Sequence, residues 1–178
     1  EAFYNSFAVG DTRQDATVLD IVAFAAATGA TYTEGYEHTG YYNNKYIPRA
    51  GESGGQTELN YLTNFRIIRY SDVLLMAAEA YNRGGIDDGL AQEVLNQVRR
   101  RAFGDDDHDI SASGTALTDA IWEERKFELS MEGHRFFDLV RTGQAPSMIA
   151  GFQQGKHEVF PIPQQEIDIS GLTQNPGY

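Results

Sequence analysis

The sequence contains no cysteine, which excludes disulfides, thiolate zinc sites and thiol catalysis within its 178 residues. It also lacks a long apolar run. The longest candidate, residues 18–27, is interrupted by Asp20 and is much shorter than the roughly 20 apolar residues of a membrane-spanning helix. Length and a hydrophobic content of 41% are sufficient for one domain with a hydrophobic core.

Positive charge is scarce: 14 Lys and Arg stand against 26 Asp and Glu, a formal net charge of -12. Such a chain repels phosphate backbones, so we expect no nucleic-acid partner. The local exception is the run Arg99-Arg100-Arg101, which lies within a helical pattern.

Motifs of the common enzyme classes are also missing. There is no nucleophile elbow, phosphate-binding loop or dinucleotide fingerprint, and the four histidines do not have the spacing of zinc hydrolases. Hydrolysis by a pair of carboxylates is not excluded by a sequence with 26 acidic residues. No pair, however, is singled out by its position.

An acidic loop follows the basic run. Asp105, Asp107 and Asp109 match positions one, three and five of an EF-hand, but Ile110 replaces the glycine and Ala116 replaces the final glutamate. An EF-hand is therefore excluded. The sequence predicts a solvated acidic loop, with an irregular calcium site as the weaker alternative, and no other cofactor.

The middle of the chain predicts a helix hairpin over 64–103. Asn64 can cap a first helix, which a Gly-Gly pair ends, and Asp87 or Asp88 begins a second helix that ends near Gly104. Small residues along both helices allow close packing. The pair resembles one tetratricopeptide unit in size.

Residues 117–143 predict a helix–glycine–helix corner. Thr118 caps a helix that continues to Glu132, Gly133 ends it as a left-handed cap, and a short second helix covers 135–141.

Three glutamates in this corner recur four residues apart and so share one helix face, where like charges need cations. The metal interpretation is weaker, because Met131 stands where a Glu-x-x-His motif before His134 requires glutamate. We therefore favour a structural clamp in which arginines of the same segment neutralise the carboxylates. Its members are Glu124, Arg125, Glu128, Glu132, Arg135, Asp138 and Arg141.

Residues 1–60 are rich in Gly, Thr, Tyr and Asn, and within them 18–27 could form a strand or a buried helical turn. The loop after it combines flat aromatic rings with amides and carboxylates, which suits a sugar ligand. Packing of the same tyrosines over the helices is the competing interpretation. The candidate ligand-binding residues are Tyr32, Tyr36, Tyr41, Tyr42, Asn43 and Asn44.

Five segments, in this order and at this spacing, resemble the C-terminal half of the SusD/RagB family. The segments are residues 68–80, 95–102, 124–143, 160–163 and 174–178. The resemblance implies a mainly α fold with a tetratricopeptide-like hairpin, long irregular loops, little β structure and an irregular C-terminal segment over 144–178. It also implies that 1–178 is the C-terminal portion of a longer protein whose N-terminal half is absent.

The family's function is then the expectation for this chain. The resemblance implies non-enzymatic binding of oligosaccharides by a lipid-anchored protein on the outer face of the outer membrane, with delivery to a SusC-like TonB-dependent transporter. The lipid anchor would precede this chain. A helical-repeat scaffold for proteins or peptides is the alternative function, and a glycoside hydrolase is a weaker one.

Overall fold

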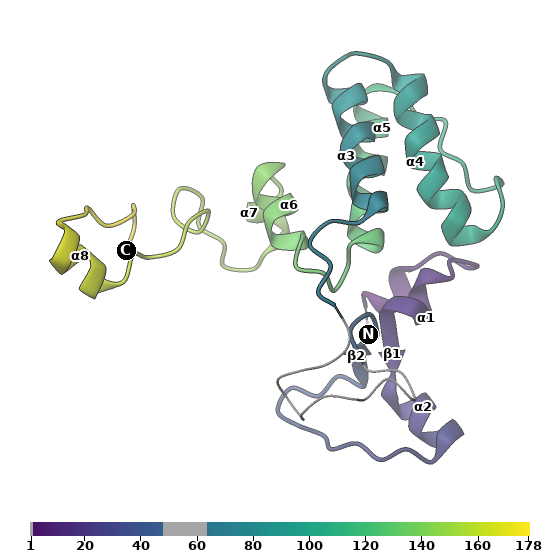
Figure 1. Cartoon of the computed structure of the whole chain (residues 1–178), viewed down its shortest axis with the longest axis horizontal. Coiled ribbons are helices and arrows are strands. Elements are labelled where there is room, and N and C mark those ends of the chain that lie inside the picture. Colours follow the sequence, from purple (N-terminus) through teal and green to yellow (C-terminus); the bar gives the residue numbers. More distant parts are fainter. Residues whose placement is uncertain (1, 48–63) are drawn as a thin grey trace. The chain divides into compact units, whose positions relative to one another are not determined.

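The structure, a computed structural model, describes residues 2–47 and 64–178. These residues are mostly helical with one two-stranded sheet, which confirms the predicted mainly α fold class (Figure 1). The chain forms two compact units, residues 1–132 and 133–178. The boundary between them falls inside the 117–143 segment.

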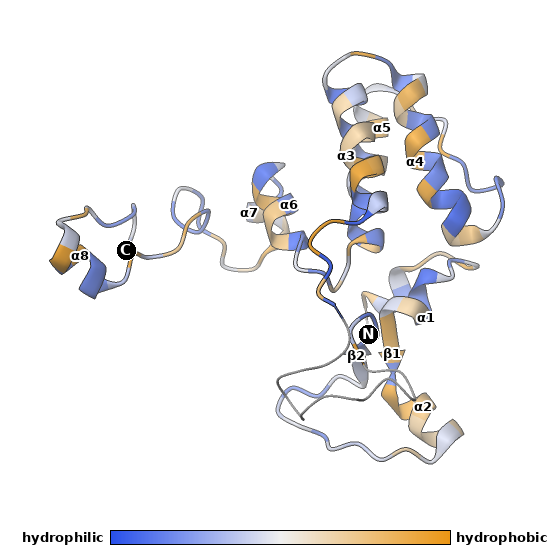
Figure 2. Ribbon diagram, viewed as in Figure 1, coloured by the Kyte–Doolittle hydropathy of each residue, from blue (hydrophilic) through white to orange (hydrophobic). Residues whose placement is uncertain are grey.

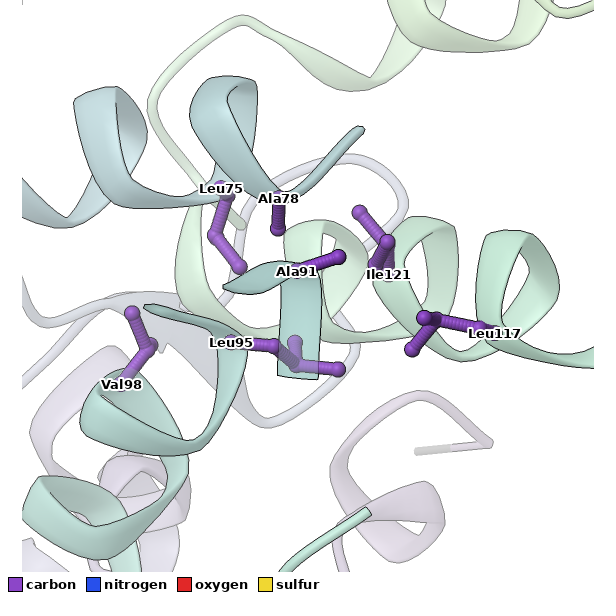
Figure 3. Close-up of a cluster of buried hydrophobic side chains, with 7 residues drawn as sticks. All are labelled: Leu75, Ala78, Ala91, Leu95, Val98, Leu117 and Ile121. Carbon is purple, nitrogen blue, oxygen red and sulfur yellow. The ribbon is translucent and has the colours of Figure 1, made fainter. Parts of the chain in front are cut away.

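The N-terminal unit is built around a helix hairpin. Helix α3 (Tyr70–Arg83) and helix α4 (Asp88–Phe103) run antiparallel, and helix α5 (Gly114–Glu128) packs against both (Figure 1). All three helices turn apolar side chains inward at helical spacing. Figure 3 shows the resulting core, formed by Leu75, Ala78, Ala91, Leu95, Val98, Leu117 and Ile121.

Both ends of α4 agree with the prediction from the sequence. The Asp87 carboxylate accepts hydrogen bonds from the N–H groups of Gly89 and Leu90, at 2.7 and 3.1 Å, and so caps the first turn. At the other end Gly104 is left-handed, with φ 85°, and closes the helix.

The start predicted for α3 is wrong. The helix begins at Tyr70, because Arg69 is extended at φ -118° and ψ 156° and its side chain reaches two carboxylates of α5. Ile67 and Ile68 are 74% and 66% exposed, so no burial of apolar surface favours another helical turn there. Asn64 lies outside the helix.

Both predicted ends of α5 also need correction. The helix begins at Gly114, and Thr118 lies inside it, where its hydroxyl bonds to the Asn82 side chain at the end of α3. It ends at Glu128, because the Glu128 carbonyl accepts hydrogen bonds from Lys45 Nζ at 2.8 Å and Arg69 Nη2 at 2.9 Å. Gly133 is left-handed, at φ 85°, but lies beyond the cap.

The segment before the hairpin resolves the ambiguity over 18–27, because it contains both a strand and a helix. Its elements are a 3-10 helix (Tyr4–Ser6), α1 (Arg13–Thr17), β1 (Val18–Asp20), α2 (Ile21–Thr28) and β2 (Tyr41–Asn43).

Strands β1 and β2 are antiparallel, and Leu19 lies opposite Tyr42. The Asp20 carboxylate ends the strand by accepting the N–H of Ala23, at 2.9 Å, as the cap of α2. The segment is joined to α4 by Thr12, whose hydroxyl and N–H both bond to the Ala102 carbonyl.

The C-terminal unit contains three short helices: α6 (Arg135–Arg141), α7 (Ala145–Met148) and α8 (Gln164–Ser170). Helix α6 confirms the short second helix that the sequence predicts. The proline-flanked stretch at 160–163 has no strand partner among the described residues. Its Ile162 instead bonds through both backbone groups to the Gln174 side chain, at 2.8 and 2.9 Å.

Apolar residues are distributed unevenly along these elements. Figure 2 shows α2 as an apolar helix and the last turns of α4 as hydrophilic. Within residues 2–47 and 64–178, no helix has both the length and the apolar character needed to cross a membrane.

Candidate functional site

The candidate tyrosines lie on β2 and on the loop between α2 and β2. Three rings of this region follow one another: the Tyr32 and His38 centroids are 5.5 Å apart, and those of His38 and Tyr42 are 5.7 Å apart. Tyr42 Oη also lies 3.3 Å from His38 Nδ1. We call these three residues the aromatic ledge.

The ledge is held by the sheet at one end and by a turn at the other. Tyr42 is the central residue of β2 and is paired with Leu19 of β1. Before the strand, Gly40 is left-handed at φ 83°, and Glu37 adopts φ 58° although it carries a side chain. A left-handed conformation is uncommon for glutamate, so the tertiary structure maintains this turn.

The candidate tyrosines differ in exposure and in contacts. Tyr36 is 96% exposed and Tyr42 is 37% exposed, so ligands can reach both rings. Tyr41 instead stacks on Tyr4 with centroids 4.8 Å apart.

The two asparagines have structural contacts. The Asn43 side chain donates to the Met131 carbonyl at 3.2 Å and accepts the Lys45 N–H at 2.9 Å. Asn44 is buried, and its side chain donates to the Asp15 carbonyl at 2.7 Å. These amides fix β2 to its surroundings, and the binding role predicted for the candidate residues stays a prediction.

His38 is not among the residues that the sequence singles out. It lies between Tyr32 and Tyr42 in the ledge and is only partly buried. The available signal was its position within the tyrosine-rich loop, but its lack of a metal-binding spacing removed it from consideration. A histidine ring supplies both a face for stacking and a hydrogen-bonding nitrogen.

The ledge combines what a sugar requires. Ring faces can pack against the C–H surface of a pyranose, while phenol and imidazole groups can exchange hydrogen bonds with its hydroxyls. A polar contact within the ledge joins the Tyr42 hydroxyl to the His38 ring. The arrangement is therefore suited to binding.

The second concentration of polar groups is the glutamate ladder, formed by Glu124, Glu128 and Glu132. Their side chains are 1%, 2% and 3% exposed, so each carboxylate needs a charged partner. Glu124 accepts from Arg13 Nη1 at 2.5 Å and from Arg99 Nη1 at 2.6 Å.

The other two members share their cations. Glu128 accepts from Arg69 Nη1 at 2.9 Å and Arg13 Nη1 at 3.3 Å, and it also pairs with Arg101. Glu132 accepts from Lys45 Nζ at 2.5 Å and from Arg69 Nε at 2.7 Å.

These partners correct the predicted clamp. The cations beside the ladder come from α1, from the residues after β2, from the residue before α3 and from α4, and not from the corner itself. Arg125 pairs with the buried Asp72 at 2.8 Å. Arg135 and Arg141 begin and end α6, and Arg141 pairs with Asp138 of the same helix at 2.8 Å.

Two carboxylates of the ladder, Glu128 and Glu132, have lowered pKa values. Burial alone raises the pKa of Glu128, but Arg101 and Arg69 lower it by more, so this pKa lies below its usual value. Burial likewise raises the pKa of Glu132, but hydrogen bonds from Arg69 and Lys45 lower it by more. This pKa therefore also lies below its usual value. A general acid needs the opposite shift, so these groups lack the perturbation expected of a catalytic acid.

The acidic loop does not bring its aspartates together. Asp105 accepts the Asp107 N–H at 3.2 Å and contacts the His108 ring at 3.0 Å, whereas Asp109 pairs with Arg100. In the described parts of the chain, no group of three or more His, Cys, Asp or Glu residues could hold a metal ion. Calcium binding stays a prediction.

Comparison with known proteins identifies the family to which these features belong. The profile of the SusD family matches residues 3–178. The chain belongs to the SusD family. This confirms the resemblance derived from the five sequence segments.

Solved SusD-like structures share the fold closely. Surface glycan-binding protein A from Bacteroides thetaiotaomicron is 34% identical and superposes with a TM-score of 0.83, over 99% of this chain and 40% of that one. A laminarin-binding SusD-like protein is 42% identical with a TM-score of 0.79, over 95% of this chain and 36% of its own. A further structure of surface glycan-binding protein A contains laminarihexaose.

Sequence relatives in the SusD family give the same picture. SusD-like protein P2 of Formosa agariphila is 30% identical over 154 residues, which are 78% of this chain and 29% of that protein. The chain thus spans well under half the length of the relatives that it matches.

Proposed function

We propose that the protein binds oligosaccharides at the cell surface, without cleaving them, and passes them to a TonB-dependent transporter of the outer membrane. The observation that carries this proposal is the likeness over 99% of the chain, at a TM-score of 0.83, to a surface glycan-binding protein. That protein has also been observed with laminarihexaose.

The aromatic ledge supports the proposal, and we propose it as the surface that contacts the ligand. It presents a row of three rings on the loop and strand that the sequence singled out for sugar binding. Tyr36 adds a fourth ring, almost fully exposed, two residues before His38. We assign sugar stacking to Tyr42 and Tyr32, and hydrogen bonding to the His38 ring and the tyrosine hydroxyls.

The test is a calorimetric titration with laminarihexaose. Tyr42→Ala and His38→Ala should each weaken binding by at least about fivefold, because removal of a residue that carries binding energy costs more than about 1 kcal/mol. Tyr70→Ala is the matched control, since Tyr70 is 73% exposed on α3 and outside the ledge. Equal affinities of all four proteins would refute the assignment of the ledge.

Absence of turnover is tested separately. After prolonged incubation, chromatography should recover laminarihexaose at its original chain length, and shorter products would support the hydrolase alternative instead. Delivery to a transporter predicts that deletion of the gene abolishes growth on the bound glycan in the source organism. Wild-type growth without the protein would contradict that part of the proposal.

A further inference from the structure

A cavity lies beside the glutamate ladder and shares no residue with the aromatic ledge. It has a volume of about 240 Å³. We call it the cationic cavity, because its charged lining consists of five basic side chains and two acidic ones. They are Arg13, Lys45, Arg66, Arg69 and Arg101 with Glu128 and Glu132.

The charges around this cavity do not balance among the described residues. Its carboxylates and the further ion-pair partners Asp11, Glu124 and Arg99 bring the group to six cations and four carboxylates. Two positive charges are left in excess. This local surplus contrasts with the net charge of -12, which repels anions from the protein as a whole.

The surplus belongs to two guanidinium groups whose donors are largely unused. Arg69 bonds through all three of its nitrogens, whereas Arg101 makes one hydrogen bond, from Nη2 to Glu128, among the described residues. Arg66 is exposed and lies over the Tyr46 ring, with Cζ 5.7 Å from the centroid. Both therefore have N–H groups available for an additional acceptor.

Three other basic side chains of the lining are partly removed from water and bound in ion pairs. The side chains of Arg13, Lys45 and Arg69 are 7%, 16% and 22% exposed. Burial, assisted by the neighbouring Arg69, lowers the pKa of Lys45 even though Glu132 opposes this effect. An anion placed here would meet the N–H groups of Arg66 and Arg101 beside these partly buried charges, where the surroundings screen charge less than bulk water does.

We propose that the cationic cavity is a binding site for one small anionic group, a carboxylate or a sulfate, held by Arg66 and Arg101. The volume of the cavity indicates whether it can hold a complete small molecule or one charged group. Cavities for complete small molecules usually measure about 300–1,000 Å³, so one of about 240 Å³ accepts a free anion or the charged end of a larger molecule. This inference does not depend on glycan binding at the aromatic ledge.

The test is calorimetric titration of the intact protein at constant ionic strength, with sodium sulfate and sodium glucuronate as separate probes and neutral glucose as the reference for the sugar ring. We expect saturable binding of sulfate, glucuronate or both. We expect at least about a tenfold loss of affinity in the double variant Arg66→Gln/Arg101→Gln. The two probes distinguish a free inorganic anion from a sugar carboxylate.

Arg83→Gln is the matched control, because Arg83 lies outside the cavity, is about half exposed and pairs with Glu79. Its replacement removes one positive charge, as does each single replacement in the cavity. Arg66→Gln alone provides a second test that leaves every described ion pair of the ladder intact. Sulfate also stabilises proteins by exclusion from their surface, but that effect does not saturate and should be equal in all variants.

Saturable binding that is lost in the cavity variants and retained by Arg83→Gln would support the site. Binding that is absent from the wild type, or that persists unchanged in the double variant, would overturn it.

Discussion

Replacement of Glu124 by glutamine tests the glutamate ladder most sharply. The carboxylate is 1% exposed, and its two oxygens receive Arg13 at 2.5 Å and Arg99 at 2.6 Å. Glutamine has nearly the same shape but only one acceptor atom, so its amide nitrogen would face one of the two guanidinium groups. One of the two cations would lose its Glu124 acceptor. Arg13 would keep Asp11, at 2.6 Å, whereas Arg99 would keep the His108 carbonyl, at 2.7 Å, but no described carboxylate.

The expected cost follows from that loss. Removal of one member of a buried ion pair typically destabilises a protein by about 3–5 kcal/mol, because the remaining charge is left uncompensated. Folded domains are stable by only about 5–15 kcal/mol. We therefore expect Glu124→Gln to remove a large part of the stability of the N-terminal unit.

The chain offers an adjacent control on the same helix. Glu123 is 54% exposed and pairs with Lys126 at 2.6 Å, and exposed pairs of this kind contribute about 0–1 kcal/mol. Glu123→Gln makes the same chemical change and the same change in net charge. We expect it to be nearly neutral.

Urea unfolding followed by the fluorescence of Trp122 measures both variants. Trp122 is the single tryptophan of the sequence and lies on α5, so its signal reports on the helix that carries the ladder. With an unchanged m-value, the difference between the two midpoints multiplied by m gives the difference in the free energy of unfolding. Similar losses in the two variants, or a loss below about 1 kcal/mol for Glu124→Gln, would refute the importance of the buried pairs.

Three further predictions concern acidity, a helix cap and a loop. Because the pKa values of Glu128 and Glu132 are lowered in the folded state, their stabilisation is complete above about pH 4.5, near the pKa of an unfolded glutamate. It is lost as the pH falls further, which urea midpoints measured from pH 6 to pH 3 will show. Asp87→Ala should cost about 1 kcal/mol by uncapping α4, whereas Asp87→Asn should cost less, as thermal melts can measure. Asn96→Ala should cost about 1–3 kcal/mol in urea unfolding, because the buried amide bonds both backbone groups of Ile110, at 2.8 and 3.0 Å.

Local signals were sufficient for part of the fold. The cap at Asp87, the glycine at 104 and the helix over 135–141 all follow from neighbouring residues, and the structure contains each of them. The start of α3 and the ends of α5 could not be predicted from neighbouring residues, because contacts with distant parts of the chain determine them. The Arg69 side chain binds Glu128 and Glu132 of a distant helix, and this role leaves its backbone extended.

The same distinction applies to the ladder. A spacing of four places the three glutamates on one helix face, so their need for cations could be predicted. The identity of those cations could not, since Arg13 is separated from Glu124 by 111 residues and Lys45 from Glu132 by 87. Nothing in the local pattern distinguishes these cations from the nearer arginines of the corner.

For the aromatic ledge, composition identified the loop but not which members face a ligand. Tyr41 and Tyr42 are adjacent, yet alternation along a strand turns them to opposite faces, and only the structure shows that Tyr41 stacks on Tyr4. His38 became a candidate only when its ring was placed between two tyrosines.

The wide separation of the ladder's partners has a consequence for the order of folding. The hairpin helices and α5 are close in sequence, so they can associate early, whereas contacts that close long loops form late. Interactions that are absent from the transition state leave the folding rate almost unchanged and slow unfolding. The ladder, whose ion pairs reach as far back as Arg13, therefore determines mainly how long the finished unit survives before it opens, and hardly how fast it forms.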